Sequence, residues 1–385
     1  MGEDRPMALP PASLAALAAA AHVFGAPRHL ELAGLADDPR AKAWPVPFSV
    51  APVLALRGAQ VAVLASGDPF WFGAGGSLAR HLAAGEWAAY PAPSTFALAA
   101  ARLGWRIEEV ACMGLHAAPF EQLAPLMDAG ARAICLLRDG TAAGALAAWL
   151  AARGFGASQC HVLERLGGPQ ERCRTTRADA FALADVAAPV AMAVAFAGAR
   201  GIARSSGLPD HLFSHDGQIT KRPVRALTLS ALGPRAGELL WDLGAGSGSV
   251  GIEWCLAGGR AVAVERHEGR LAHIRANAQS FGLAHRLQVV AGDTAAVLAD
   301  LPAPDAVFIG GGASAALIDA AWARLGAGGR LVANGVTLET EAVLAAAQAR
   351  HGGELLRVEL AHARPLGRFR GWEAVRPVVQ WSAWR

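Results

Sequence analysis

From about residue 236 onward, short apolar runs alternate with longer segments in which apolar residues recur at helical spacing. The runs at 238–244, 260–266, 286–293, 305–311 and 329–336 are almost continuously apolar, as strands buried on both faces are. Helical periodicity fills the intervals, for example "SVGIEWCLA" and "EGRLAHIRANAQSFG". Repeated strand–helix units predict an α/β fold with a parallel, doubly wound sheet.

Two stretches near the C-terminus show a different pattern. Residues 354–363 and 372–381 alternate apolar and polar positions and are joined by "RPLGRFRG". Such alternation is typical of half-buried strands, so we expect a terminal antiparallel hairpin at the edge of the sheet.

The N-terminal half is also predicted to be α/β. Apolar strands are expected at 131–137, 158–168 and 189–196, with a helix over 142–154. Earlier in the chain, an apolar strand leads into "GDP", and a second strand ends in the prolines of "YPAPST". A helix then begins at Ser94-Thr95, a favoured N-cap pair.

The segment 198–212, "GARGIARSSGLPDHL", is glycine-rich and basic, and we interpret it as a linker. The sequence therefore predicts one domain over 1–197 and another over 213–385. A chain of 385 residues fits two domains, and 53% hydrophobic residues are ample for two cores.

Charge and cysteine content narrow the function classes. The formal net charge is +3 and basic residues are dispersed, so we expect no nucleic-acid partner. Five cysteines without a C-x-x-C pair argue against disulfides or a zinc site, and no metal is expected. No charge-free apolar run reaches about 18 residues, so we expect no membrane span and a cytoplasmic protein.

The strand at 238–244 runs into a glycine loop, "GAGSG". Gly244, Gly246 and Gly248 lie where open α/β sheets bind ligands, and glycines there permit tight turning and close ligand approach. Ala245 and Ser247 complete the predicted cofactor loop. Alone, this motif is also compatible with a simple tight turn.

Three acidic residues sharpen the interpretation. Glu265 ends the second strand, where a carboxylate can accept both hydroxyls of a ribose. Asp293, after the third strand, can accept from an adenine amino group, although it also fits a helix N-cap. Asp242 precedes the loop and would lie near the amino-acid end of S-adenosylmethionine. Together these acids favour S-adenosylmethionine as the cofactor over a nicotinamide.

Several motifs resemble known families. "SGDPFWFG", "PAPSTFALAAARLGW", "LLRDG" and "VLERLGGPQER" are similar to the tetrapyrrole (corrin/porphyrin) methylases. "GLPDHLF", "ITKRPVRALTLSAL", "LWDLGAGSGSVGIEW", "FIGGGAS" and "LVANGVTLET" resemble the decarboxylating precorrin methyltransferases of cobalamin synthesis. The resemblance implies a tetrapyrrole-methylase α/β domain followed by a Rossmann-like class I methyltransferase domain.

The same resemblance implies the reaction. The substrate would be precorrin-6B, methylated at C5 by the N-terminal half and at C15 by the C-terminal half. Loss of the ring C acetate carboxyl as carbon dioxide would give precorrin-8X. Asp68, Pro69, Ser94 and Thr95 would line the first methyl-donor site. Thr220 and Thr294 would join the glycine loop in the second, although Thr220 also fits the N-cap of a helix over 221–232.

The tetrapyrrole substrate carries many carboxylates, so basic residues should contact it. We predict carboxylate clamps at five residues near the glycine loop or the late hairpin turn. These residues are Lys221, Arg222, Arg225, Arg364 and Arg368. No residue is identified as the catalytic acid or base, because methyl transfer depends mainly on positioning.

The start of the chain departs from the resembled family. Tetrapyrrole methylases open with an apolar strand that leads into a "GIGxDG"-like loop. This chain begins with Gly2, Glu3 and Asp4 at the position of that loop, so we expect the first strand to be missing. Either the true start lies upstream, or the N-terminal site is impaired.

Other functions share parts of this pattern. An RNA or protein methyltransferase with an accessory domain would also use the glycine loop and the acids. An NAD-dependent oxidoreductase would use Gly244–Gly248 and Glu265 but leaves Asp293 unexplained, and a non-catalytic binding protein would keep only the pocket. We also expect self-association into a homo-oligomer.

Overall fold

The computed structural model describes residues 2–3 and 9–385, which form two compact units. Unit 1 comprises residues 1–120 and 126–201, and unit 2 comprises 121–125 and 202–385. The division falls inside the predicted linker, 198–212. The second half of that linker is packed rather than free, because the backbone N–H groups of Gly207 and Leu208 donate to the buried carboxylate of Glu253.

Unit 1 begins with a small three-stranded parallel sheet in the order β2-β1-β3. Its elements are α1 (Pro11–Ala19), β1 (His22–Gly25), α2 (Pro27–Leu32), β2 (Ala41–Ala43), α3 (Ala51–Leu54), β3 (Val61–Val63) and α4 (Ala74–Ala79). The loop remnant predicted at the chain start is only partly visible in this part, because Asp4 lies outside the described residues.

The second sheet of unit 1 has five strands in the order β4-β5-β8-β6-β7. Its strands are β4 (Ala111–Gly114), β5 (Arg132–Leu137), β6 (Gln159–Glu164), β7 (Arg172–Arg177) and β8 (Val190–Ala195), with helices α5 (Thr95–Leu103) and α6 (Gly140–Leu150). Only the β4–β5 pair is parallel. The strand expected before the prolines at 91–93 is absent, since residues 87–94 are described and form none.

Unit 2 holds a seven-stranded sheet in the order β11-β10-β9-β12-β13-β17-β14. Its strands are β9 (Leu239–Leu243), β10 (Arg260–Glu265), β11 (Leu287–Ala291), β12 (Ala306–Ile309), β13 (Arg330–Gly335), β14 (Glu354–Val358) and β17 (Val378–Trp384). Strands β9 to β13 are parallel, as predicted, and β17 runs antiparallel between β13 and β14. This alternating architecture confirms the Rossmann-like prediction for this half.

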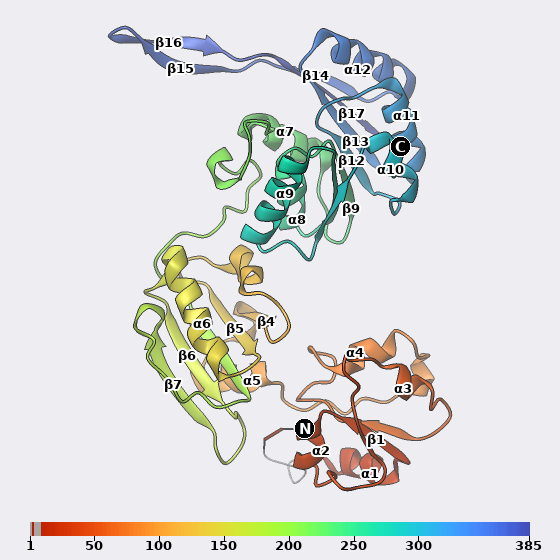
Figure 1. Cartoon of the computed structure of the whole chain (residues 1–385), viewed down its shortest axis with the longest axis vertical. Coiled ribbons are helices and arrows are strands. Elements are labelled where there is room, and N and C mark those ends of the chain that lie inside the picture. Colours follow the sequence, from red (N-terminus) through yellow and green to blue (C-terminus); the bar gives the residue numbers. More distant parts are fainter. Residues whose placement is uncertain (1, 4–8) are drawn as a thin grey trace. The chain divides into compact units, whose positions relative to one another are not determined.

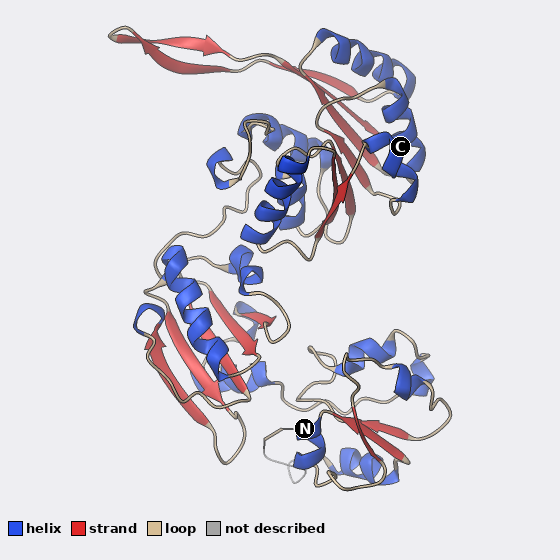
Figure 2. Ribbon diagram, in the orientation of Figure 1, coloured by secondary structure: helices blue, strands red, loops and turns tan. Residues whose placement is uncertain are grey.

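Helices cover both faces of the unit 2 sheet (Figures 1 and 2). They are α7 (Arg222–Leu232), α8 (Ser249–Leu256), α9 (Glu268–Ser280), α10 (Thr294–Val297), α11 (Ala315–Arg324) and α12 (Leu338–His351). Successive residues of β9 point to opposite faces, so Trp241 packs with α11 and α12, whereas Leu240 packs with α7, α8 and α9. Each face therefore has its own apolar core.

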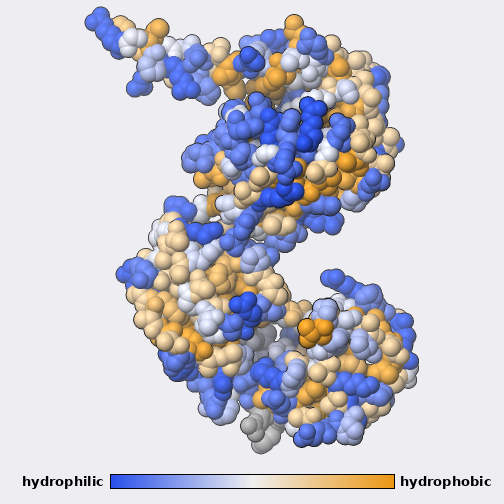
Figure 3. All heavy atoms as spheres, in the orientation of Figure 1, coloured by the Kyte–Doolittle hydropathy of each residue, from blue (hydrophilic) through white to orange (hydrophobic). Residues whose placement is uncertain are grey.

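The predicted terminal hairpin is more elaborate than expected. Strands β14 and β17 pair at the sheet edge, and the chain between them forms a separate hairpin of β15 (Ala361–Leu366) and β16 (Phe369–Ala374). Nearly all of its residues are exposed, and its surface mixes hydrophilic and hydrophobic atoms (Figure 3). The sequence pattern did not separate these two strand pairs.

Candidate functional site

The glycine loop of unit 2 joins β9 to α8 at the carboxyl end of the parallel strands. Gly246 and Gly248 have φ values of +59° and +72°, in the left-handed region that favours glycine. A Cβ on Gly248 would lie only 3.0 Å from Cγ2 of Ile274, and one on Gly246 would lie 3.3 Å from the backbone oxygen of Gln218. The loop therefore approaches its neighbours too closely for larger residues.

A cavity of about 670 Å³ opens beside this loop, within the range of small-molecule sites. It lies at the ends of β9 to β13, where the fold places ligands. Eight predicted cofactor or substrate residues line it: Thr220, Lys221, Gly244, Ala245, Gly246, Glu265, Asp293 and Thr294. The structure thus brings most of the predicted second site together.

Glu265 connects the glycine loop to the end of β10. Its side chain is buried, and Oε2 accepts a hydrogen bond from the N–H of Gly246 at 2.9 Å. Oε1 accepts from the N–H groups of Arg266 and His267 at 2.9 and 3.0 Å. The carboxylate is consequently fixed at the cavity wall by backbone donors, with its position coupled to the loop.

Two predicted residues turn out to have different local roles. Asp293 is both a helix cap and a wall residue, since Oδ1 accepts from the N–H of Ala295 at 3.0 Å and the residue lines the cavity. Thr220 is not the N-cap of α7, because Lys221 holds that position without a side-chain hydrogen bond. Thr220 instead lines the cavity.

Asp242, in β9, and Ser247, within the loop, do not line the cavity. Asp242 accepts from the N–H of Gly251 at 3.0 Å through Oδ2, while Oδ1 has no partner among the described residues. Burial, with a contribution from the charge of Glu265, raises the pKa of Asp242 to about 7. The hydroxyl of Ser247 is also buried without a partner. Together with Gly248, both residues support the loop without lining the cavity.

The prediction of a substrate clamp at Arg225 is wrong. Its side chain is fully buried and donates from Nε to Glu253 at 2.6 Å, with a second ion pair to Asp210 at 3.0 Å. It also donates to the backbone oxygens of Leu208 and Thr220. Four hydrogen bonds hold the guanidinium inside the protein, so Arg225 fastens the start of unit 2 to its core.

The other predicted clamps lie in two places. Lys221 lines the cavity, and Arg222 begins α7 beside it with an exposed side chain. Arg364 and Arg368 lie on the β15–β16 hairpin, and neither lines the cavity. Arg364 pairs with Glu373 at 3.5 Å, and Arg368 covers the ring of Phe369. Their roles as clamps stay predictions.

Sequence reasoning missed Asn334, a polar residue at the end of the apolar strand β13. It lines the cavity, and its amide is held by Thr228 and Gln380 in a buried network with distances of 2.9 to 3.0 Å. The signal was the polar residue near the carboxyl end of "GRLVANGV", directly after the apolar run 331–333. A neutral, fixed amide therefore forms part of the wall.

Unit 1 brings its predicted residues together from two segments. A Cβ on Gly67, just before Asp68, would lie 2.7 Å from Cα of Ser94, so the "GDP" loop rests directly on the start of α5. Ser94 caps α5 by accepting from the N–H of Ala97 at 3.1 Å, and Asp68 accepts from the N–H of Phe70 at 2.8 Å. Asp68–Pro69 and Ser94–Thr95 thus belong to adjacent loops.

The fold and the glycine-loop cavity define unit 2 as a Rossmann-like methyltransferase domain, which implies a methyl donor. The tetrapyrrole (corrin/porphyrin) methylase model matches residues 1–182, and the precorrin methyltransferase domain model matches residues 211–385. A protein of Sinorhizobium sp. named precorrin-6Y C(5,15)-methyltransferase [decarboxylating] is 47% identical, over 99% of this chain and 94% of its own length. The chain belongs to this family of decarboxylating methyltransferases.

Further relatives carry the same name. One from Mycobacterium tuberculosis is 41% identical over 99% of this chain and 97% of its own length. A crystal structure of the C-terminal domain of the Rhodobacter capsulatus protein is 57% identical in sequence, with a TM-score of 0.47. The match covers 48% of this chain and 100% of the chain in that structure.

Across residues 2–3 and 9–385, no helix combines the length and apolar character that crossing a membrane requires.

Proposed function

We propose that this chain methylates precorrin-6B at C5 and C15, using S-adenosylmethionine, and removes the ring C acetate carboxyl to give precorrin-8X. The observation that carries the proposal is the cavity of unit 2, where the glycine loop, Glu265 and Asp293 meet at the ends of parallel strands. The names of the full-length relatives agree with it.

The residues of this cavity fit S-adenosylmethionine. The alternating glycines of the loop let a ligand approach the backbone, Glu265 would hold the ribose hydroxyls, and Asp293 would face the adenine. When bound, this cofactor supplies a methyl group on a sulfonium that leaves readily. The protein then needs chiefly to place the substrate carbon and exclude water.

Part of the cavity wall suits decarboxylation. Val336 and Val378 line the cavity together with the neutral amide of Asn334. A carboxylate beside apolar and neutral groups is less well solvated, which favours its loss as neutral carbon dioxide. The bonding electron pair stays on the macrocycle, and the former carboxyl-bearing carbon takes up a proton. Lys221, which lines the cavity, and Arg222, next to it at the start of α7, would hold other carboxylates of the substrate.

In unit 1, Asp68, Pro69, Ser94 and Thr95 would form the first methyl-donor site and serve methylation at C5. Mass spectrometry of a reduced precorrin substrate, incubated with the full chain and the methyl donor, tests the whole proposal. Gain of two methyl groups with loss of one carbon dioxide is expected. Gain of one methyl group with that loss would restrict the proposal to unit 2, and an unchanged mass would refute it.

Equilibrium dialysis tests the cofactor independently of the substrate. Two molecules of S-adenosylmethionine should bind each chain, and NAD should not compete with them. The variant Glu265→Gln should weaken one of the two sites only. Binding of NAD in place of S-adenosylmethionine would instead favour an oxidoreductase.

We also infer that copies of this chain associate through the β15–β16 hairpin. Leu366, Phe369 and Trp372 are 68%, 67% and 79% exposed there, and an isolated two-stranded hairpin is only marginally stable in water. Packing against the same hairpin of a second copy would cover Leu366 and Phe369, which oppose each other across the two strands and share one face. The variant Leu366→Ser/Phe369→Ser should have a lower molar mass in light scattering, and an unchanged mass would contradict the inference.

A further inference from the structure

Unit 1 contains a second cavity, of about 590 Å³, which we call the arginine cavity. Three arginines from separate segments line it: Arg28 from α2, Arg138 after β5, and Arg165 after β6. None of Asp68, Pro69, Ser94 and Thr95 lines it. The cavity is therefore distinct from the residues predicted to hold the methyl donor.

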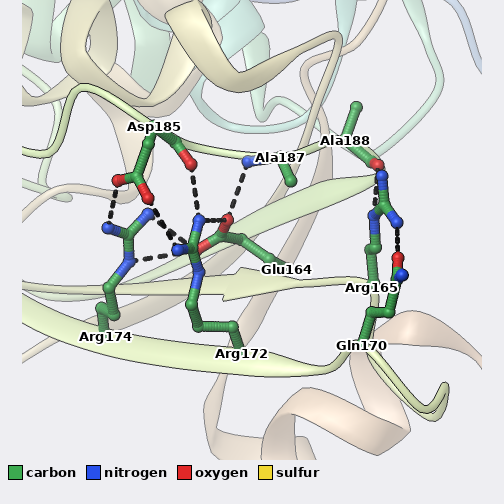
Figure 4. A network of polar contacts seen from close by, with 8 residues as sticks. All are labelled: Glu164, Arg165, Gln170, Arg172, Arg174, Asp185, Ala187 and Ala188. Carbon is green, nitrogen blue, oxygen red and sulfur yellow. Dashed lines mark hydrogen bonds and ion pairs between the residues drawn. The ribbon is translucent and has the colours of Figure 1, made fainter.

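Arg165 is held in a costly conformation. Its φ of +49° places a non-glycine residue in the left-handed region, which the surrounding structure must stabilise. The guanidinium donates from Nε to the backbone oxygen of Ala188 at 3.1 Å and also hydrogen-bonds Gln170 (Figure 4). Two fixed contacts therefore aim this cation at the cavity, whose wall includes Ala188 and Pro189.

The wall beside Arg165 is braced by an ionic network around the buried carboxylate of Glu164. The carboxylate of Glu164 accepts from Arg172 and Arg174 at 2.6 and 2.9 Å, and from the N–H of Ala187 at 2.7 Å (Figure 4). Asp185 pairs with both arginines at 2.7 and 2.6 Å. The segment from Asp185 to Ala188 is thereby tied to β6 and β7, so the wall is rigid.

Three arginines and two acids, Glu3 and Glu31, line the cavity, so its charged side chains leave a net positive balance that favours an anion. Burial lowers the pKa of Arg28, and the positive charge of Arg165 lowers it further, so these two cations repel each other. Glu3 already forms an ion pair with Arg28, which shows that the cavity accommodates a carboxylate. Arg138 is mostly exposed and pairs with Asp139 at 2.9 Å. A ligand carboxylate between the guanidiniums would relieve the repulsion.

Both sides of the arginine cavity connect to the predicted methyl-donor loops of unit 1. On one side, His29, next to Arg28, hydrogen-bonds Ser66 at 2.8 Å, and Ser66 begins the "SGDP" loop. On the other side, Glu171 accepts from the N–H of Gly167 at 2.7 Å and pairs with Arg102 of α5 at 2.5 Å. The helix that starts at Thr95 is thus fastened to the segment that carries Arg165.

We propose that the arginine cavity binds acetate or propionate carboxylates of the tetrapyrrole substrate and so orients the macrocycle toward the donor site of unit 1. The inference rests on the proposed function and deepens it, because it assigns substrate-binding residues to a domain where none was assigned. Arg28, Arg138 and Arg165 are positioning residues, since they contact carboxylates away from the reacting carbon.

The test compares Arg138→Gln and Arg165→Gln with the control Arg106→Gln, an exposed arginine that lies outside the cavity. Both cavity variants should raise the KM for C5 methylation by about tenfold, as expected for loss of a charged hydrogen bond, with kcat nearly unchanged. Methylation at C15 and binding of the methyl donor should not change. An unchanged KM in both variants would overturn the proposal.

A binding measurement separates this proposal from the proposed function. Uroporphyrin, a fluorescent porphyrin octacarboxylate, should bind the full chain, and Arg138→Gln should weaken that binding about tenfold while Arg106→Gln does not. Because Arg138 is exposed, this variant is expected to fold even where Arg165→Gln does not. If neither Arg138→Gln nor Arg106→Gln changes the affinity for uroporphyrin, the proposal that the arginine cavity binds carboxylates is refuted. Arginine-dependent binding without any C5 methylation would refute the proposed reaction of unit 1 alone.

Discussion

The two predicted methyl-donor sites are built in opposite ways. In unit 2, one contiguous loop at 244–248 meets acids at the ends of the next two strands, so neighbouring parallel strands assemble the site. In unit 1, the "GDP" loop must dock onto the start of α5, more than 20 residues further along the chain. A site made by one fold motif can be located from local sequence, whereas a docked site depends on packing between distant segments.

The two units also differ in how deeply their ion pairs are buried. Arg225 and Glu253 of unit 2 are both fully enclosed, whereas Glu164 of unit 1 is buried but its partner Arg172 keeps 40% of its side chain exposed. Solvent can compensate a lost partner in unit 1 more easily than in unit 2. The following changes test this contrast.

The largest effect should come from Arg225→Met. It leaves the carboxylate of Glu253 buried without its cation, which costs about 3–5 kcal/mol. Scanning calorimetry should show the unit 2 transition at a much lower temperature, with the unit 1 transition unchanged. The matched change Arg172→Met should lower the unit 1 transition by less. Equal decreases of the unfolding temperature in the two variants would contradict the expected difference between the ion pairs of the two units.

Gly244→Val should reduce C15 methylation by about a hundredfold, since it strains a left-handed position by roughly 1–3 kcal/mol and crowds the cavity. Gly244 has a φ of +69°, and its Cβ would lie 3.3 Å from the backbone oxygen of Gly311. Methylation at C5 should persist. Gly269→Val serves as the control, because no atom lies within 4 Å of that Cβ position. Retained C15 activity would show that the loop tolerates a side chain.

The two units should respond oppositely to acid. The pKa of Asp242 is raised to about 7, so its contribution to stability is full at low pH and is lost as the pH rises through 7. For Glu164, burial opposes a lower pKa, but hydrogen bonds from Arg172, Ala187 and Arg174 lower it overall. Its contribution is therefore present above pH 4.5 and lost as the pH falls through the lowered pKa.

Lowering the pH from 7 to 5 should stabilise unit 2 by about 2 kcal/mol through Asp242. Unit 1 should instead lose stability in this range, because burial lowers the pKa of His29 to about 4 while its imidazole in the unfolded chain takes up a proton near pH 6.5. Asp242→Asn keeps an oxygen for the N–H of Gly251 and should abolish the stabilisation of unit 2. Calorimetric midpoints at both pH values measure it. The same pH response in the variant would assign the effect to another group.

Glu265→Gln should weaken methyl-donor binding to unit 2 by about tenfold, because an ionised acceptor of hydrogen bonds is replaced by a neutral amide. Titration calorimetry measures this affinity. Glu268→Gln is the matched control, since its exposed side chain lies outside the cavity wall. Equal affinities for both variants would argue against a ribose contact at Glu265.

Ser94→Ala should have the smallest effect, a loss of about 1 kcal/mol from unit 1, because it removes the cap on α5. If Ser94 also contacts the methyl donor, one of the two binding sites should weaken as well. Thermal unfolding and dialysis together separate these roles. Weaker binding without any loss of stability would show that the cap is dispensable.

The parts that could be predicted from sequence are those with local causes. The strands of unit 2 are apolar runs between glycine turns, and the N-cap at Ser94 follows from the side chain alone. Strand β7, "RCRTTR", was missed because ion pairs with Glu164, rather than apolar burial, hold it in the sheet. Arg225 was misassigned because its partner Glu253 lies 28 residues away, and the sequence does not show which of them is buried.

The anchoring of Gly207 and Leu208 to Glu253 also bears on how such a two-part chain could arise by gene fusion. A gene for unit 2 alone would have to start before Gly207, because a later start removes two of the donors that neutralise a buried carboxylate. The junction between the ancestral genes would therefore lie upstream of the codon for that glycine.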